Sequence, residues 1–261
     1  MDKGNFSILL KNTIEVVQEV GQWMRTQRVA VQEIETKTPN NLVSFADKES
    51  ERRLVTAFRQ IFPEAGFIAE EGTGEKAQEW NWVIDPLDGT TNYLHGVPIW
   101  CISVALCHHR DPVLAVIYDP NRDELFSAIK GGGAWLNEHP MRVSTENNLR
   151  DSLLVTGFPY DDFGREEAYI GLFRHLMKET RGIRRLGSAA LDLAWVACGR
   201  FEAFYEYGLN PWDVAAGCLL IQEAGGEVTG FYDGHPIFEE DILASNQKIH
   251  DELRRRIQRF F

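Results

Sequence analysis

Apolar residues in the first part of the chain recur with the period of a helix. Residues three and four positions apart share one helical face, so this spacing predicts a long opening helix. A second helix is expected to begin at the capping residue Ser44, to carry Leu54, Phe58 and Ile61 on one face, and to end near Pro63. The apolar positions of the opening helix are Phe6, Leu9, Leu10, Ile14, Val17, Val20 and Met24.

Short apolar runs follow the second helix and predict strands. The glycine run 131–133 predicts a turn before one of these strands. This part of the chain is therefore expected to be α+β, with a meandering sheet. The predicted strands lie at 67–69, 82–84, 102–107, 113–118 and 134–136.

Strands and helices alternate in the second half of the chain, which predicts a layered α/β arrangement. Strands are expected at 153–155, 201–206 and 242–245, and helices at 165–178, 188–199 and 212–224. A last helix carries Ile249, Leu253 and Ile257. We expect one compact unit with two lobes, comprising residues 1–145 and 146–261.

The net charge of −12 restricts the partners of this protein. An acidic chain is repelled by nucleic acids and by anionic membranes, so we expect neither as a partner. No apolar run approaches the roughly 20 residues that cross a bilayer, and residues 1–5 show no signal-peptide pattern. A cytoplasmic protein is expected. If its substrate is also an anion, a cation must neutralise the site, which points to metal ions.

The four cysteines, Cys101, Cys107, Cys198 and Cys218, form no CxxC pair and lie among apolar residues. They are predicted to be buried free thiols, as expected in a reducing compartment. The seven histidines show no HxH or HExxH spacing, so the sequence offers no zinc motif.

The strongest chemical signal lies at residues 82–92, where an apolar run leads into Asp85 and Asp88. Pro86 cannot continue a central ladder, so we expect the strand to end at Asp85. Gly89 permits a close backbone approach, and the amides of residues 89–91 are expected to begin a helical turn that faces an anion. The alternative is an Asx-type turn with a capping aspartate.

Two further acidic positions extend this signal. Glu70-Glu71 ends a strand, and because neighbouring strand residues point to opposite faces, only one of them is expected to serve as a ligand. Asp213 lies in the first turn of a helix capped by Asn210. The alternatives are an ordinary charged strand end and a favourable interaction with the helix dipole.

Together, four of these carboxylates would repel one another unless protons or cations intervened between them. Ligands that are all oxygen suit Mg²⁺, Mn²⁺ or Ca²⁺ rather than zinc. Spacing alone leaves open whether these side chains meet. The four residues are Glu70, Asp85, Asp88 and Asp213.

These residues resemble the inositol monophosphatase family of lithium-sensitive, magnesium-dependent phosphatases, in its bacterial branch. The resemblance implies a layered αβαβα sandwich, usually as a homodimer, that hydrolyses myo-inositol monophosphate. The matching segments cover nearly the whole chain: 37–43 leading to Asp47, Glu70-Glu71, 85–92, 187–190, Trp212-Asp213 and 223–226.

The resemblance also implies a role for each position. Glu70, Asp85 and the Leu87 carbonyl resemble a first Mg²⁺ site, and Asp85, Asp88 and Asp213 a second. Glu70 also matches the ligand of a third, weaker ion.

The same resemblance assigns the reacting groups. Asp47 and Thr90 match the pair that orients the attacking water, with Glu70 in the catalytic set. The substrate-binding positions that match are Asp88, Gly89, Thr90, Ala189, Glu206 and Asp213.

Three other activities stay open. Some microbial relatives hydrolyse fructose 1,6-bisphosphate and others act on nucleotides, and a lipid-linked inositol phosphate also stays open as the substrate. Relatives that act on nucleotides or histidinol phosphate tend to carry Lys or Arg where this chain has Thr91. A non-catalytic protein-binding role in transcription is the alternative from a different class.

Overall fold

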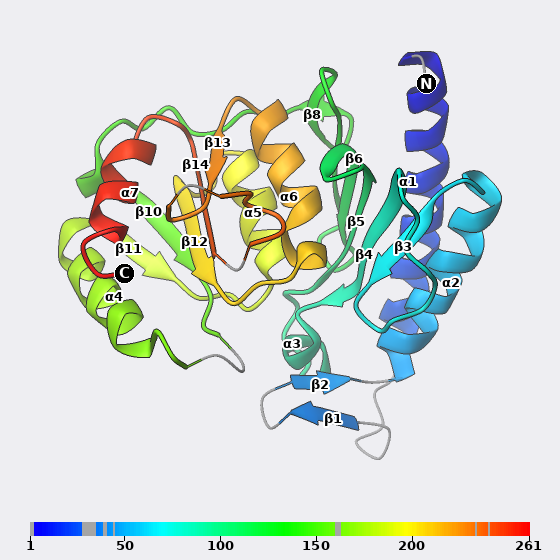
Figure 1. The fold of residues 1–261 in the computed structure, drawn as a ribbon, viewed down its shortest axis with the longest axis horizontal. Coiled ribbons are helices and arrows are strands. Elements are labelled where there is room, and N and C mark those ends of the chain that lie inside the picture. The colour runs from blue at the N-terminus through cyan, green and yellow to red at the C-terminus, as the bar shows by residue number, and fades with distance from the viewer. Residues whose placement is uncertain are drawn as a thin grey trace.

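The computed structural model describes residues 3–27, 35–38, 41–43, 45–159, 163–232, 234–239 and 241–261. Five layers of alternating helices and sheets build the molecule, as the resemblance predicts (Figure 1). The opening helices α1 (Lys3–Thr26) and α2 (Phe45–Ile61) pack against each other and against a seven-stranded sheet. The apolar face predicted for α1 is therefore the face that covers this sheet. Ser44, the predicted cap of α2, lies outside the described residues.

The seven-stranded sheet is a meander in which each strand pairs with the next along the chain. Its first pair is parallel and the other five are antiparallel. In order, its strands are β3 (Gly66–Ala69), β4 (Trp80–Asp88), β5 (Cys101–His108), β6 (Asp111–Asp119), β7 (Glu124–Ile129), β8 (Gly133–Leu136) and β9 (His139–Pro140). A separate hairpin joins β1 (Glu35–Thr38) to β2 (Asn41–Val43).

The second sheet mixes parallel and antiparallel pairs in the order β11-β10-β12-β14-β13. Its outer face packs against α4 (Glu166–Glu179) and α7 (His250–Ile257). A short 3-10 turn at Leu149–Asp151 leads into it. Its strands are β10 (Leu153–Thr156), β11 (Gly182–Arg184), β12 (Ala203–Tyr207), β13 (Glu227–Thr229) and β14 (Asp241–Ser245).

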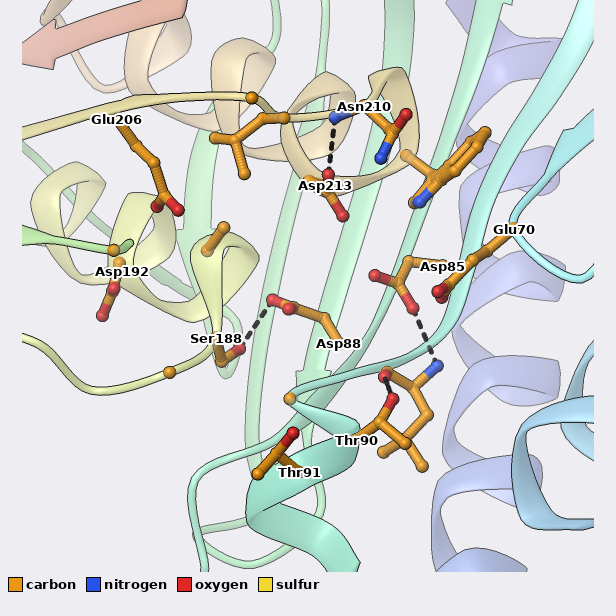
Figure 2. A pocket seen from close by; sticks show the side chains of 18 of the residues that line it. Glu70, Asp85, Asp88, Thr90, Thr91, Ser188, Asp192, Glu206, Asn210 and Asp213 are labelled. Atoms are coloured by element: carbon orange, nitrogen blue, oxygen red, sulfur yellow. Dashed lines mark hydrogen bonds between the residues drawn. The ribbon is translucent and has the colours of Figure 1, made fainter. Parts of the chain in front are cut away.

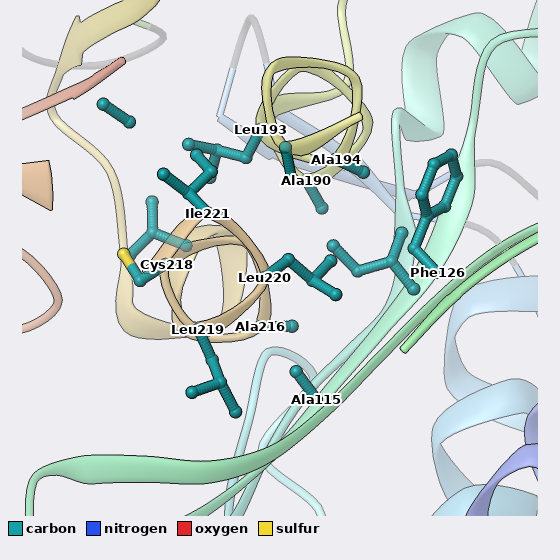
Figure 3. Packing of buried hydrophobic residues seen from close by; sticks show 14 of the residues in the cluster. Ala115, Phe126, Ala190, Leu193, Ala194, Ala216, Cys218, Leu219, Leu220 and Ile221 are labelled. Atoms are coloured by element: carbon teal, nitrogen blue, oxygen red, sulfur yellow. The ribbon is translucent and has the colours of Figure 1, made fainter. Parts of the chain in front are cut away.

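Two helices, α5 (Ala189–Ala197) and α6 (Pro211–Glu223), lie between the two sheets and contact both. They approach closely because Gly217 has no side chain: a Cβ there would lie 2.5 Å from the Cβ of Leu193. Leu220 and Ala115 show this packing between α6 and β6 (Figure 3). One cluster of buried side chains therefore runs from the first sheet to the second.

The helices and most strands agree with the sequence-based expectations, whereas β1, β2, β7, β9, β11 and β13 were not anticipated. The division near residue 145 stays a prediction. The first sheet ends at Pro140 and the second begins at Leu153, yet the central cluster joins both halves. None of the described helices combines the length and apolarity needed to cross a bilayer. All four cysteines are free thiols, and Cys198 is partly exposed whereas the other three are buried.

Candidate active site

Strand β4 delivers two aspartates to one pocket by passing through a bulge. Asp85 pairs with Ser103 and Asp88 with Cys101, so three steps along β4 match two along β5. The expectation that the strand ends at Asp85 is therefore wrong. A bulge leaves one residue outside the regular ladder, and Pro86, which has no N–H to donate, fits there without losing a hydrogen bond.

Gly89 turns the chain from β4 into the short helix α3 (Thr90–Leu94). Its φ of 95° is left-handed, and a Cβ there would lie 2.9 Å from the Ile99 carbonyl oxygen. Both observations require glycine. The predicted helical turn at this position is confirmed.

Thr90 lies within hydrogen-bonding distance of two acceptors at the start of α3. Its hydroxyl is 3.0 Å from Asp47 Oδ1 and 3.0 Å from the Leu87 carbonyl oxygen. A hydroxyl has one hydrogen, so Thr90 donates to one of them at a time. Asp47 is buried in the first turn of α2, which brings the predicted Asp47–Thr90 pair together.

The four predicted carboxylates line one pocket together with Gly89, Thr90, Ala189 and Glu206 (Figure 2). Glu70 follows β3, and its N–H donates to the Ile84 carbonyl at 3.2 Å. Glu71 is not among the lining residues, in agreement with the expectation that one of the pair faces the site. Asp213 also anchors its own helix, because its Oδ2 accepts the Asn210 N–H at 2.6 Å.

The turn that carries Glu70 is tied to α2 by Glu51. This fully buried carboxylate accepts the backbone N–H groups of Glu71 and Thr73, both at 2.7 Å. Glu51 lies one helical turn after Asp47, so both project from the same face of α2. A single helix therefore positions the Thr90 partner and the Glu70 turn.

Burial and mutual repulsion raise the pKa of the pocket acids. Burial raises the pKa of Asp85 well above its ordinary value, and the charges of Glu70, Asp88 and Asp213 raise it further. Burial followed by the Asp88 charge likewise raises the pKa of Asp213 well above its ordinary value. Among the described residues that line the pocket, Arg185 alone carries a cationic side chain. The acids therefore need protons or bound cations.

Hard divalent cations fit this donor set, since every predicted ligand atom is an oxygen. No three of the pocket carboxylates, all of them among the described residues, bring donor oxygens within 4.8 Å of one another. We therefore expect that the pocket carboxylates either move towards one another when an ion binds or coordinate different ions.

Asp88 is held by the second half of the chain. Its Oδ2 accepts the Ser188 hydroxyl and the Ala190 N–H, both at 2.6 Å. Burial raises the pKa of Asp88, and these two donors oppose the increase. Ser188 caps α5, which the sequence could have indicated, but its bond to a residue 100 positions away could not be read from spacing.

Glu206 lies on the opposite wall of the pocket, at the end of β12, and is 4% exposed. Burial, followed by the Asp213 charge, raises its pKa to about 8. Gly157 leaves room for this side chain, since a Cβ at that position would displace the Glu206 carboxylate.

Asp192 also lines the pocket and was not anticipated from the sequence. It is buried, its Oδ1 has no hydrogen-bond partner, and burial raises its pKa well above the ordinary value. Arg185, the other lining residue that was missed, opposes this increase. Asp192 is a single aspartate within an apolar helix, and Arg185 is one of three arginines at 181–185, so neither residue type nor spacing singled them out.

The chain is similar to known proteins of one family over nearly its whole length. A model of the inositol monophosphatase family matches residues 7–260. The inositol-1-monophosphatase of Rhizobium meliloti is 42% identical over 97% of each chain. The Nus factor SuhB of Pseudomonas aeruginosa is 44% identical over 89% of this chain and 88% of its own.

Two solved structures share the fold over nearly their whole length. The inositol monophosphatase from Anabaena superposes with a TM-score of 0.86 at 41% identity, covering 98% of this chain and 97% of its own. The extragenic suppressor protein suhB from Bartonella henselae gives a TM-score of 0.90 at 37% identity, covering 96% and 98%.

Proposed function

The chain belongs to the inositol monophosphatase family, and from this premise we propose that it is a magnesium-dependent phosphatase that releases phosphate from myo-inositol monophosphate. The observation that carries the proposal is the gathering of Glu70, Asp85, Asp88 and Asp213 in one pocket beside Thr90. Such a group of buried and half-buried acids favours bound cations and, with them, an anionic substrate.

The proposed ion ligands are Glu70, Asp85 and the Leu87 carbonyl for one Mg²⁺, and Asp85, Asp88 and Asp213 for another. Glu70 is also the proposed ligand of a third, weaker ion, and Mn²⁺ suits the same oxygens. Bound Mg²⁺ would neutralise phosphate charge and lower the pKa of a coordinated water.

The remaining chemistry falls to side chains and amides of this chain. When Thr90 donates its hydrogen to Asp47, its oxygen lone pairs are free to accept a hydrogen from water, which aims that water at phosphorus. The amides of residues 89–91 at the start of α3 offer hydrogen bonds to phosphate oxygens. Water attacks phosphorus as the bond to the alcohol oxygen breaks, so no phosphoenzyme is required.

The substrate alcohol is proposed to lie against Ala189, Glu206 and Asp213. A carboxylate accepts hydrogen bonds from vicinal hydroxyls, so Glu206 supports a polyol such as inositol. Fructose 1,6-bisphosphate is the nearest alternative substrate. Thr91, in place of Lys or Arg, gives no support to a nucleotide or histidinol phosphate.

A panel assay tests the proposed activity. Phosphate release should require Mg²⁺, should be inhibited by Li⁺, and should be faster with inositol 1-phosphate than with fructose 1,6-bisphosphate or glycerol phosphate. Asp88→Asn should lower the rate about 100-fold or more, because it removes one proposed ion ligand. The proposal is wrong if Mg²⁺ supports no release from any of these esters.

A second candidate role is protein binding in transcription, because several relatives at about this identity are named Nus factor SuhB. Asp88→Asn separates the two roles. A binding role should survive this substitution, whereas turnover should not. We also propose a cytoplasmic homodimer, as is usual in the family.

A further inference from the structure

A second group of metal-binding side chains lies away from the pocket, at the other end of β4. Glu79 immediately precedes β4, and His108 is the last residue of β5. His109 begins the two-residue turn into β6. Glu79 lies six residues before Asp85 along an extended strand, a span of about 20 Å. The group is therefore outside the phosphatase site.

Backbone pairing fixes these three residues against one another. Trp80 pairs with His108 in the ladder, and the His109 N–H donates to the Glu79 carbonyl at 2.6 Å. The backbone at these ends of β4 and β5 therefore holds Glu79 beside the two histidines, independently of the side-chain conformations.

An unusual backbone angle brings the two imidazoles together. Adjacent strand residues point to opposite faces, which would separate His108 from His109. His109 instead has a left-handed φ of 57°, which breaks the alternation, and the ring centroids lie 4.4 Å apart. The His108 ring also stacks on Trp80 at 4.4 Å, which restricts its orientation.

The donor atoms are already close enough for one ion. One imidazole nitrogen from each histidine and one Glu79 carboxylate oxygen all lie within 4.8 Å of one another. Among the described residues, no other three His, Cys, Asp or Glu side chains bring their ligand atoms within this distance of one another. Zinc bonds of about 2.1 Å place tetrahedral ligands about 3.4 Å apart, so small side-chain rotations would complete the geometry.

The chemistry of these donors differs from that of the pocket. Two imidazole nitrogens with one carboxylate suit Zn²⁺ and neighbouring transition metals, whereas Mg²⁺ prefers oxygen ligands. The two charged residues that follow His109 already have partners of their own. The Arg110 guanidinium stacks on the Phe238 ring at 4.8 Å, and the Asp111 carboxylate lies 3.6 Å from the Lys130 ammonium group. Glu79 and His109 are exposed, so water can occupy the remaining position.

We propose that Glu79, His108 and His109 form a binding site for Zn²⁺ that is separate from the phosphatase pocket. Three protein ligands with one position left to water give an exchangeable site rather than a closed structural one.

Equilibrium dialysis of the chelator-treated protein against Zn²⁺ tests the site, with saturating Mg²⁺ present to occupy the acidic pocket. The double variant His108→Phe/His109→Asn removes both nitrogen ligands. Phenylalanine can still stack on Trp80, and asparagine tolerates a left-handed φ. The matched control is His139→Asn, at an exposed position on β9.

Wild type and His139→Asn should each bind one Zn²⁺ more than the double variant, or bind it at least tenfold more tightly. All three proteins should unfold at similar temperatures without Zn²⁺, and Zn²⁺ should raise this temperature less for the double variant. Equal zinc binding by all three would overturn the proposal. Phosphate release is measured separately, so failure of this site and failure of the phosphatase proposal remain distinguishable.

Discussion

Replacing Glu51 with glutamine should weaken both the fold and the proposed first ion site. The Glu51 carboxylate is fully buried and accepts two backbone N–H groups, from Glu71 and Thr73, each at 2.7 Å. Glutamine keeps one acceptor oxygen but puts an NH₂ group against the other donor. One buried N–H then loses its partner, which costs about 1–3 kcal/mol, and the remaining bond loses its charge assistance.

We therefore expect Glu51→Gln to lower the free energy of unfolding by about 2–3 kcal/mol. For a chain of this length the corresponding fall in melting temperature is about 5–10 °C. The turn that carries Glu70 should also loosen, and the Mg²⁺ concentration for half-maximal phosphate release should rise about tenfold, as for other residues that support a metal ligand from behind.

Urea unfolding and a Mg²⁺ titration of phosphate release measure the two effects. Glu49→Gln is the matched control on the same helix, because Glu49 forms ion pairs near the surface with Arg52 and Arg53. That change should cost under about 1 kcal/mol and leave the Mg²⁺ titration unaltered. A Glu51→Gln protein as stable as Glu49→Gln would refute the reasoning, and an unshifted Mg²⁺ titration would remove Glu51 from the support of Glu70.

Three further predictions concern the rest of the pocket. Thr90→Ala should lower kcat for phosphate release about 100-fold or more, because the hydroxyl that is hydrogen-bonded to Asp47 orients the water. The melting temperature should stay within a few degrees of that of the wild type, and a nearly unchanged kcat would exclude this role. Because burial raises the pKa of Glu206 from 4.5 to about 8, the folded metal-free protein keeps a proton that the unfolded chain releases, and its stability should fall as the pH rises through that range. Chemical unfolding across this range should show a smaller fall for Glu206→Gln, and parallel curves for the two proteins would contradict the assignment. Gly157→Ala should raise KM for inositol 1-phosphate about tenfold or more by displacing Glu206. Equal KM values for Gly157→Ala and wild type would argue against contact between Glu206 and the substrate.

The sequence predicted the helices of this fold better than its shorter strands. α1 follows from a clean helical spacing of apolar residues, and that spacing is a local property of the chain. β11 and β13 have three residues each and are only partly buried, so their existence depends on neighbours that a local pattern does not contain. The bulge at Pro86 was missed for a related reason, because only the pairing partner reveals an extra residue in a strand.

The candidate site shows the same division between local chemistry and distant geometry. Asp85, Asp88 and Gly89 were identified from one short segment whose residue types are unusual together. Asp192 was not, because a single aspartate within an apolar helix has no such context. The closeness of Ser188 to Asp88 depends on how α5 packs between the two sheets, and no motif encodes that distance.

The two walls of the pocket have different origins, and this difference has a consequence for substrate choice. Glu70, Asp85 and Thr90 come from the first sheet and its loops, whereas Glu206 and Asp192 come from the second sheet and α5. The proposed ion ligands and water-positioning groups lie mostly on the first wall, and the groups that would meet the alcohol lie on the second. Changes at the second wall can therefore alter which alcohol is accepted while the phosphate chemistry is retained.

Buried acids that find a hydroxyl partner in one substrate are left unpaired by another, which is a strong source of discrimination. On this reasoning Asp192→Asn should change the ratio of kcat/KM between inositol 1-phosphate and glycerol phosphate more than it changes the Mg²⁺ requirement, and a parallel loss with both substrates would place Asp192 in the support of the fold instead.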